Sequence, residues 1–576
     1  MQQTPTGGVS EEEPFPPVTA ELLSSSYIPS EVEVSQIQLL LKAVELRLDG
    51  FNVEKLSTVQ KQRDNLQDVR DQYRAVVSPT RRLPVEILLQ IFFLACVPGL
   101  SLVGDEEVMA PALDISQICS FWRQIALGCT EIWSNLSVNI FCGPGSRNAQ
   151  VVDLYLLNSQ SSPLRLHITA QRDLGDDDWR WVSREDLIRS DRTILNSLLK
   201  EAHRWSTVSF ELFNDILFSA GPSCEIWEPL GEHPELQCLT SLFVVWDTEY
   251  DDPDADYHFF MQAPNLQSLE ATSLQYNLIA SHSNLQSLKL DQPIWFPPDA
   301  IWLFRTCTSL KDIQFSGDLN DEDPEVEDDP ILTPISCDEL DSLRYLYYGG
   351  NVTPLLISIL ILPSLTILDL TVSQSNLTLR TRHSMSQELR QMLQRSGCQL
   401  SVLRLSDALF LSAKDLIELI ALTPTVVDFT ICPDMEDSEV FTKNLFQSLS
   451  FNLDSNVLMT SRSLTNPFML LPRLKCFSLV THHHSATQNS TRQTDSSLPH
   501  LDSENIYTMI HSRRYPPNDN ANDVLEKLEQ FHLSVYLGST QARRRTWLDT
   551  FSSSLEPHLR GLEREGLELT LKVQIW

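Results

Sequence analysis

A short phrase of the form L-x-x-L-x-L recurs from about residue 200 onward, and it constrains the fold more than any other feature of the sequence. Its last three positions alternate between apolar and variable residues, which predicts a short strand with one buried face. Apolar runs with helical spacing precede several copies, as in LLISILILP before Leu365. The copies begin at Trp205, Leu239, Leu266, Leu285, Leu310, Leu343, Leu365, Leu400, Val426, Leu474 and Leu528.

The spacing of these copies predicts how the units assemble. A unit of one strand and one helix cannot bury its own apolar face, so neighbouring units must stack. Several successive copies lie 19 to 26 residues apart. This spacing matches the period of leucine-rich repeats, and the longer steps indicate insertions or a missed copy. Residues 200–576 therefore resemble an irregular leucine-rich-repeat solenoid, an α/β repeat, although an α/β domain with a parallel sheet has the same alternation.

Segments without the phrase mark the boundaries and insertions of this array. Residues 1–30 are rich in Pro, Ser and Glu and are expected to form a disordered tail. Residues 137–199 are expected to connect the N-terminal part to the repeats. Within the repeats, 318–330 is expected to be an acidic loop and 481–502 a disordered, low-complexity one. The last residues, GLELTLKVQIW, alternate like a final strand that closes the array.

Residues 31–78 have the apolar spacing of paired helices. The first apolar run consists of Ile37, Leu41, Val44 and Leu48. Its steps of 4, 3 and 4 residues are those of a heptad seam. A second run follows after a break, so a helical hairpin or a short coiled coil is expected. Two outcomes stay open: the helices pack within their own chain, or they join two copies into a homodimer.

Residues 79–136 predict a small unit of short helices with more apolar surface than it can bury. Leu83 precedes Pro84 and is held extended, Pro84 suits the first turn of a helix, and Glu86 complements the helix dipole there. A unit of about fifty residues buries little surface alone. Either the rest of the chain covers its apolar helices, or another protein does so by taking an amphipathic helix into a groove. The other apolar positions are Ile87, Leu88, Ile91, Phe92, Ile118, Cys119, Trp122 and Trp133.

The order of these residues resembles the F-box, the motif that docks on the Skp-type adaptor of cullin-based ubiquitin ligases. The similar stretches are Leu83-Pro84-x-Glu86-Ile87-Leu88-x-x-Ile91-Phe92, Ile118-Cys119-x-x-Trp122-Arg123 and Ile132-Trp133. The loop between the helices is longer and more acidic than in the compact motif, and Ile118 stands where the family often has Val or Leu. The flanking sequences also resemble the expanded F-box family of mushroom-forming fungi. Adaptor contacts are thereby implied for Leu83, Pro84, Glu86, Ile87, Leu88, Ile91, Phe92, Ile118, Cys119, Trp122 and Trp133.

The resemblance implies a non-catalytic function. A protein of this family is the substrate-recognition subunit of a ligase: its F-box binds the adaptor, and through it the cullin, while its repeats bind the target. Its contribution is proximity, because a held substrate lysine meets the ubiquitin-charged enzyme at a raised effective concentration. The sequence contains no nucleotide-binding loop, zinc-protease helix or nucleophile elbow, so neither a catalytic residue nor a cofactor is expected. The alternative is a scaffold that binds proteins outside any ligase.

The strands of the repeats also predict a substrate-binding face. Side chains alternate along a strand, so the residues between the leucines are expected to face the concave surface. Tyr345 and Tyr347 are the expected aromatic contacts, and Lys289 and Arg404, with Asp369 between them on the same face, are the expected charge readers. The alternative is that the two tyrosines pack beneath a loop and the basic residues are ordinary surface.

Composition and charge exclude several other classes of function. The chain has 43 Lys and Arg against 77 Asp and Glu, and its net charge of −34 repels a nucleic acid. The 11 cysteines include no CxxC pair, so a reducing compartment, the cytosol or the nucleus, is expected. No apolar stretch is long enough to span a membrane. The run His482-His483-His484 lies in a Ser- and Thr-rich stretch that would not fix a metal, so no metal site is expected.

Overall fold

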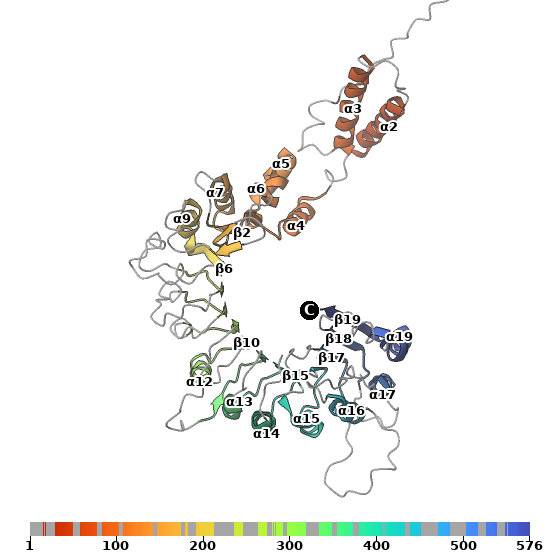
Figure 1. Ribbon diagram of the computed structural model, residues 1–576. Helices are drawn as coiled ribbons and strands as arrows, with labels where there is room; N and C mark the ends of the chain where they lie inside the picture. The colour runs from red at the N-terminus through yellow and green to blue at the C-terminus, as the bar shows by residue number, and fades with distance from the viewer. Residues whose placement is uncertain are drawn as a thin grey trace, which may run out of the picture. The chain divides into compact units, whose positions relative to one another are not determined.

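The chain folds as two compact units, Met1–Trp205 and Ser206–Trp576, drawn in Figure 1. The computed structural model describes residues 15–16, 18, 29–49, 58–77, 83–102, 108–141, 147–173, 179–181, 192–211, 236–245, 263–272, 279, 282, 284–291, 297–317, 333–347, 354–372, 379–406, 409–432, 438–450, 470–483, 503–515, 526–537, 548–549 and 551–575. The expected acidic loop 318–330 lies outside these residues. Among the helices in the described ranges, none combines the length and the apolar character needed to cross a membrane.

The first unit mixes helices with short strands. In chain order it contains α2 (Glu31–Asp49), α3 (Thr58–Val77), α4 (Val85–Ala95), β1 (Leu100–Leu102), α5 (Pro111–Ile118), α6 (Ser120–Gly128), the 3-10 helix η2 (Thr130–Trp133), β2 (Asn135–Asn139), α7 (Arg147–Ser159), β3 (Leu164–Thr169), β4 (Gln171–Asp173), β5 (Trp179–Trp181), α9 (Thr193–Lys200) and the 3-10 helix η3 (Ala202–Arg204). Strands β1, β2 and β3 pair in parallel, while β4 and β5 pair antiparallel. The expectation of an all-α N-terminal segment is therefore wrong. The loop expected between the helices contains strand β1, in which Leu100 and Leu102 alternate with Ser101 and are both buried.

Helices α2 and α3 form a hairpin with its own core. Ile37 and Val44 of α2 and Tyr73 and Val76 of α3 are buried in one cluster, and Leu41 and Leu48 pack against it. The heptad seam of residues 31–78 is therefore filled within the chain.

Part of the expected disordered tail is ordered against this hairpin. Phe15 and Val18 pack against its core, and the hydroxyl of Tyr73 donates to the carbonyl of Pro16 over 2.8 Å. The apolar side chains of these two residues explain the difference, because they cover the open side of a small helical pair. Apart from residues 15, 16, 18, 29 and 30, the predicted tail lies outside the described residues.

Two tryptophans show that strand–helix units begin before residue 200. Trp133 is the last residue of η2, which follows α6, and its indole N–H donates to the carbonyl of Ala126, seven residues earlier, over 2.8 Å. Trp205 follows α9 and η3 and donates to Leu198, again seven residues earlier, over 3.2 Å. Both indoles are fully buried at the start of a strand. The expected connecting region 137–199, which contains α7, β3 and α9, is thus built like the repeats that follow.

The second unit is a succession of strands and helices. It contains β6 (Trp205–Glu211, from Ser206), β7 (Ser241–Val245), β8 (Ser268–Ala271), β9 (Ser287–Asp291), α12 (Pro297–Thr306), β10 (Asp312–Gly317), β11 (Ile335–Ser336), β12 (Ser342–Tyr347), α13 (Pro354–Ile359), β13 (Leu360–Ile361), β14 (Ile367–Val372), α14 (Leu379–Ser396), β15 (Val402–Ser406), α15 (Ala413–Ile420), β16 (Asp428–Cys432), α16 (Ser438–Leu449), β17 (Cys476–His483), α17 (Ser503–Arg514), β18 (Gln530–Leu537), α19 (Glu556–Arg564) and β19 (Glu568–Ile575). Strand β19 is the final strand that the C-terminal alternation predicts. Strand β17 runs to His483, so the expected loop 481–502 begins inside a strand, and its residues 484–502 lie outside the described ranges.

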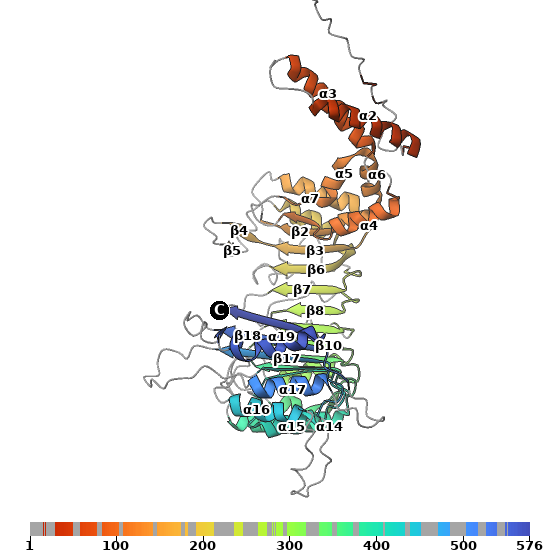
Figure 2. The same ribbon diagram turned by 90° about the vertical axis from the view of Figure 1, so that its right-hand side faces the viewer.

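Twelve strands of the second unit form one parallel sheet in chain order, β6-β7-β8-β9-β10-β12-β14-β15-β16-β17-β18-β19. Figure 2 shows β6, β7 and β8 side by side. Their apolar residues stay in register from strand to strand, so that each phrase repeats at one level of the sheet. One such row consists of Val208, Leu242, Leu269, Leu288, Ile313, Leu343, Leu368, Leu403, Phe429, Phe477 and Phe531, all buried.

The register corrects one copy of the phrase. Leu343 pairs with Ile313 and Leu368, which are second positions of their copies. The copy predicted to begin at Leu343 therefore begins at Leu340, which is buried. The prediction failed because Leu343 and Leu346 also stand three residues apart, and only strand pairing distinguishes the two alignments.

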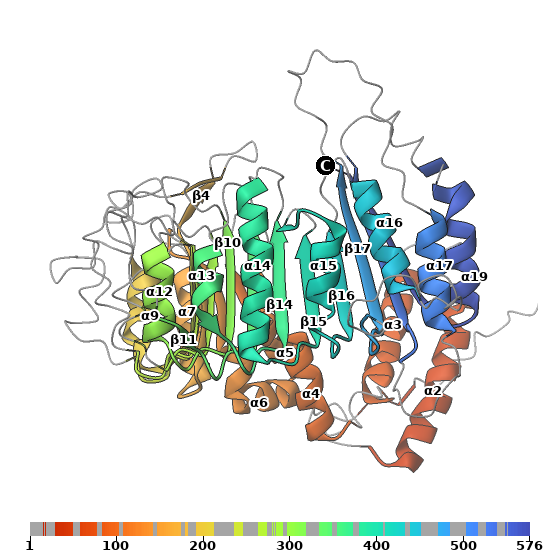
Figure 3. The same ribbon diagram turned by 90° about the horizontal axis from the view of Figure 1, so that it is seen from below.

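Helices cover one side of this sheet. In Figure 3 α12, α13, α14, α15, α16, α17 and α19 lie along the same side of strands β10, β14, β15, β16 and β17. A doubly wound α/β domain has helices on both faces, so this arrangement favours a one-sided stack of strand–helix units. The observed fold is thus α/β with a long parallel sheet wound in one direction along the chain.

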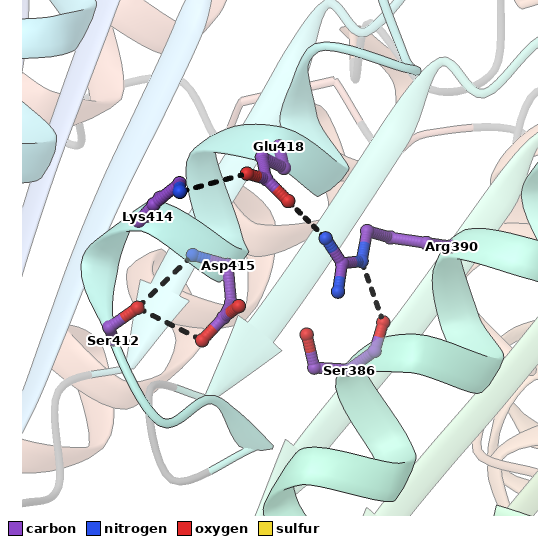
Figure 4. A network of polar contacts seen from close by, with 6 residues as sticks. All are labelled: Ser386, Arg390, Ser412, Lys414, Asp415 and Glu418. Atoms are coloured by element: carbon purple, nitrogen blue, oxygen red, sulfur yellow. Dashed lines mark hydrogen bonds and ion pairs between the residues drawn. The ribbon is translucent and has the colours of Figure 1, made fainter.

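Arginines connect successive helices. Arg390 of α14 pairs with Glu418 of α15, which Lys414 approaches to 3.8 Å, and Ser412 caps α15 by accepting from the backbone N–H of Asp415 over 3.4 Å (Figure 4). Arg395 donates to the carbonyl of Leu360 over 2.8 Å. These side chains satisfy or neutralise groups that a neighbouring unit leaves at its ends.

Arg513 of α17 is the most deeply buried of these arginines. Its guanidinium donates to the carbonyls of Leu449 at 2.8 Å and Leu471 at 2.6 Å, and also to Leu470. Leu449 is the last residue of α16, and Leu471 has a φ of 51°, which is unfavourable for a branched side chain. Burial lowers the pKa of Arg513 to about 10, so the group stays protonated at neutral pH and can donate to all three carbonyls.

Gly99, before β1, allows a close approach of two backbones. Its φ is +72°, and a Cβ there would lie 2.5 Å from the carbonyl oxygen of Asn135. We expect Gly99→Ala to lower the free energy of unfolding by about 2 kcal/mol, measured by urea titration with tryptophan fluorescence. Gly128→Ala is the matched control, because nothing lies within 4 Å of the added methyl. Equal midpoints for the two variants would contradict this account.

Arg513→Met should destabilise the second unit by about 3 kcal/mol or more, because three carbonyls of the chain lose their donor in a buried site. The measurement is thermal unfolding followed by circular dichroism. Arg473→Met changes an exposed arginine in the turn before β17 and should leave the midpoint unchanged. The role of Arg513 would be disproved by an Arg513→Met protein as stable as the control.

Candidate docking surface and strand face

Helix α4 begins at the sequence predicted for it. Pro84 precedes the helix with φ −55° and ψ 150°. Its carbonyl accepts from the backbone N–H groups of Ile87 and Leu88, each over 3.1 Å. Glu86 is exposed in the first turn, where its charge complements the helix dipole. The Leu83-Pro84 pair thus sets the start of α4, and Leu83 stays half-buried.

One face of α4 packs inside the unit. Leu88 and Phe92, one turn apart, are fully buried, and Cys96 follows them on the same face. The ring of Phe92 lies 5.0 Å from that of Trp122 in α6, at an interplanar angle of 57°. Leu88 and Phe92 therefore hold α4 on the unit and have no surface to offer a partner.

The other face of α4 is apolar and uncovered. Ile87 and Ile91 are each 41% exposed, and Leu94 is 75% exposed. Their spacing of four and three residues places them in one row along the helix. Val85 and Phe93, which the sequence interpretation left out together with Leu94, are about equally exposed, but by helical periodicity Val85 lies on the side of Leu88 and Phe92, and Phe93 lies between the two rows. We call Ile87, Ile91, Phe93 and Leu94 the α4 surface; the continuous apolar run from Ile91 to Leu94 was the signal for Phe93 and Leu94.

The junction of α5 and α6 is closed by side chains. Cys119 has extended backbone angles and separates the helices, and its sulfur accepts from the backbone N–H of Trp122 over 3.4 Å. The guanidinium of Arg123 donates to the carbonyl of Ser116 over 2.9 Å. Ile118, the last residue of α5, is 60% exposed. Cys119 and Trp122 are half-buried, and their first role is to close this junction.

The predicted adaptor residues thus separate into two groups. Leu88, Phe92 and Trp133 are core residues; Trp133 packs edge-on against Tyr155, with ring centroids 4.9 Å apart. Residues with accessible surface are Leu83, Pro84, Glu86, Ile87, Ile91, Ile118, Cys119 and Trp122. The sequence motif contains both groups because buried residues and exposed residues recur along a helix with the same period.

The second unit presents a polar row on its sheet. Between the buried apolar rows, one residue of each sheet strand from β7 to β19 is paired in register with the next. These residues are Phe243, Glu270, Lys289, Gln314, Arg344, Asp369, Arg404, Thr430, Ser478, His532 and Thr570. We call them the strand row. Of the five residues predicted to share one face, Lys289, Asp369 and Arg404 lie in it, and Tyr345 and Tyr347 do not.

The two predicted charge readers are neutralised within the strand row. Lys289 forms an ion pair with Glu270 on the adjacent strand. Arg404 lies 3.4 Å from a carboxylate oxygen of Asp369 and 3.7 Å from one of Asp428. These half-exposed pairs contribute little to stability, but they leave Lys289 and Arg404 with less charge to offer a ligand.

Tyr345 and Tyr347 occupy the wrong register for the predicted aromatic contact. Tyr345 pairs with Phe315 and Leu370, which are both buried, and Tyr347 pairs with Gly317 and Val372. The prediction took both tyrosines as intervening residues because it began this copy three residues too late. The residue of β12 that stands in the strand row is Arg344.

Three polar atoms near Arg344 have no hydrogen-bond partner. They are the Nε of Arg344, the hydroxyl of Ser342 and one carboxylate oxygen of Asp312, all buried. Ser342 and Asp312 are paired in register, and Arg344 follows Ser342 on the same side of β12. Within the part of the chain that the structure describes, no residue forms an ion pair with Arg344, in contrast to Lys289 and Arg404.

Neither reactive thiols nor metal ligands gather in the described residues. Burial raises the pKa of Cys96, Cys307 and Cys337 to about 11, and burial with Asp428 nearby raises that of Cys476 to about 12, so these thiols are protonated at neutral pH. In the ranges described, no group of three or more His, Cys, Asp and Glu is placed to hold a metal ion.

Comparison with known proteins adds no family. No protein-family model matches the sequence, and no curated protein matches it. The chemistry of the α4 surface and the strand row therefore carries the functional argument.

Proposed function

We propose that this protein is the substrate-recognition subunit of a cullin-based ubiquitin ligase. In this proposal the α4 surface docks on a Skp-type adaptor, and the leucine-rich-repeat-like array of the second unit binds a target protein. The chain itself needs no catalytic residue, because its contribution is to hold the target near the ubiquitin-charged enzyme.

The exposed apolar row on α4 is the observation that carries this proposal. Ile87, Ile91 and Leu94 leave a large part of their apolar surface in water while the opposite row is fully buried. An apolar helix face of this kind is recognised by a hydrophobic groove on a partner. The stretch that supplies the row is also the one that resembles the F-box, so chemistry and resemblance point to the same partner.

The strand row supports the second half of the proposal. A one-sided array of parallel strands offers an extended surface on which each unit contributes a variable side chain. Among the described residues the cation Arg344 has no ion-pair partner, and with the unsatisfied Ser342 and Asp312 beside it, it can both donate to and accept from a target. Reducing conditions, in the cytosol or the nucleus, are part of this proposal, since such ligases act there.

Replacement of Ile87 and Ile91 by Asp should abolish adaptor binding. Two charges in the centre of the apolar row would have to be desolvated in the partner's groove, so we expect the Kd to rise at least 100-fold. The measurement is titration of the purified full chain with a purified Skp-type adaptor. Leu157→Asp is the matched control: Leu157 is 73% exposed on α7, away from α4 in the sequence. Unchanged binding by the double variant would rule out the α4 surface.

Cullin recruitment separates the ligase from a scaffold that binds the adaptor alone. The wild-type chain and adaptor should bind a cullin together, and the Ile87→Asp/Ile91→Asp variant should not. A chain–adaptor complex that excludes the cullin would favour the scaffold.

Arg344→Glu should change which proteins the chain captures while adaptor binding persists. The substitution reverses the charge of Arg344, for which the described residues supply no counter-ion, so an acidic target should be lost. The measurement is mass spectrometry of proteins captured by each variant. Arg473→Glu makes the same charge change at an exposed turn and should capture the wild-type set. The same set for Arg344→Glu would place the target site elsewhere.

A further inference from the structure

Strand β19 ends the parallel sheet and has a free edge. It pairs with β18 on one side, and no other strand in the described ranges pairs with it. Figure 1 shows β17, β18 and β19 in succession at this end of the chain. These three strands have eight residues each, more than the other strands of the described sheet. A strand edge of this length presents a row of main-chain groups that can bind another strand.

The direction of the main-chain bonds shows which residues of β19 face that edge. The N–H of Glu568 donates to the carbonyl of Glu529 over 2.9 Å. Along a strand, successive residues direct their N–H and carbonyl groups to opposite neighbours. The even-numbered residues of β19 therefore bond to β18. Leu569, Leu571 and Val573 direct both of their main-chain groups toward the free edge.

The side chains of the same three residues are incompletely covered. The residues paired with them on β18 are Phe531, Leu533 and Val535, all buried. Leu569 and Leu571 are only half-buried, and Val573 is 39% exposed against 1% for Val535. The apolar rows thus stop at β19, where the next unit of a stacked array would cover them. The occupant that fits this edge is a strand with apolar residues at alternate positions.

Charges on the other face of β19 indicate which strand that is. Glu568 and Lys572 are exposed, and they alternate with the apolar residues. Glu568 accepts from the side-chain amide of Gln530 over 2.8 Å, and within the described part of the chain neither Glu568 nor Lys572 forms an ion pair. Thr570 lies midway between them. A second β19, antiparallel about a two-fold axis at Thr570, places Glu568 of each copy opposite Lys572 of the other.

The same register satisfies the main-chain groups. Leu569 then lies opposite Leu571 of the other copy, and because both direct their N–H and carbonyl groups to the edge, the two residues exchange both bonds. Glu568 and Lys572 become a pair without main-chain bonds, in which the Cα atoms are about 4.5 Å apart and the side chains are close. Residues directly opposite each other share a face of the sheet, so charge meets charge and leucine meets leucine.

We propose that the protein forms a homodimer in which the free edges of two β19 strands pair antiparallel about Thr570. The contact is isologous: the same residues of both copies form it, as two-fold symmetry requires. It differs from the dimer through residues 31–78 that the sequence suggested, because that heptad seam is filled within the chain. The proposal does not rest on the ligase function, since the α4 surface and Arg344 take no part in it.

One strand per copy makes a small interface, so the dimer should depend on concentration. The net charge of −34 on each chain opposes association at low salt, and added salt screens that repulsion. The experiment is sedimentation equilibrium of the full chain in about 0.15 M salt, over a wide range of chain concentrations. Wild type is expected to pass from the mass of one chain, 65.5 kDa, to twice that mass. A wild-type chain that stays monomeric throughout overturns the proposal.

Leu571→Pro tests the main-chain pairing. Proline removes an N–H that faces the free edge, and an edge strand tolerates proline at such a position. The variant should keep its circular dichroism spectrum and lose the dimer. Leu571→Ala is the matched control, because it also shortens the side chain but keeps the N–H, and it should dimerise measurably. A proline variant that dimerises as tightly as the alanine variant contradicts edge pairing.

Charge exchange tests the register on surface residues alone, where folding is not at risk. Lys572→Glu and Glu568→Lys each put like charges opposite one another at both ends of the pair, and each should raise the dimer Kd about tenfold. An equal mixture of the two variants restores opposite charges in the mixed dimer and should associate like wild type. Lys443→Glu makes the same charge change on an exposed lysine of α16 and should not weaken the dimer. A mixture that associates no more tightly than its components overturns the proposed register.

Discussion

The pairing of each strand with the next along the chain is the constraint on which the second unit depends. A strand of five or six residues has one apolar face, and a single unit offers nothing to cover its edges. Because Leu288 lies in register between Leu269 and Ile313, the apolar row becomes continuous and every member is buried. The arginines follow from this arrangement: stacked helices expose their last carbonyls to one another, and Arg395 donates to Ile357 in the last turn of α13 and Arg513 to Leu449 at the end of α16.

The same register decides which polar side chains remain available for binding. Residues of the strand row stand beside one another, so opposite charges on adjacent strands pair, as Lys289 does with Glu270 and Arg404 with Asp369. A charge can act on a ligand only where the row fails to supply its counter-ion. Arg344 stands at such a position, between Gln314 and an Asp369 that is already paired with Arg404.

Periodicity in the sequence predicts strands and helices well here, and it fails where two alignments share that periodicity. The copy at Leu400 contains one alignment, and its strand forms as predicted. Around Leu343 two alignments fit. The one chosen from the sequence put Tyr345 on the predicted binding face, whereas the strand pairing puts Arg344 in the strand row and Tyr345 outside it. On α4 the motif gives the correct helix, but it cannot separate Phe92, which packs on Trp122, from Ile91, which does not. Burial depends on neighbours that are distant in sequence, so it cannot be obtained from spacing alone.

Helix α2 shows the same limit of sequence periodicity. Its heptad seam predicts a partner helix without saying whether that helix belongs to the same chain, because knobs fit holes equally well in either case. The structure assigns Ile37 and Val44 to α3, and this assignment isolates Val32, Leu39 and Leu46 as a second seam. A helix that needs only one seam to fold gains nothing for its own stability from exposing a second. Exposed apolar rows on a surface reduce solubility, so this second row distinguishes α2 from a helix that only packs inside its own chain.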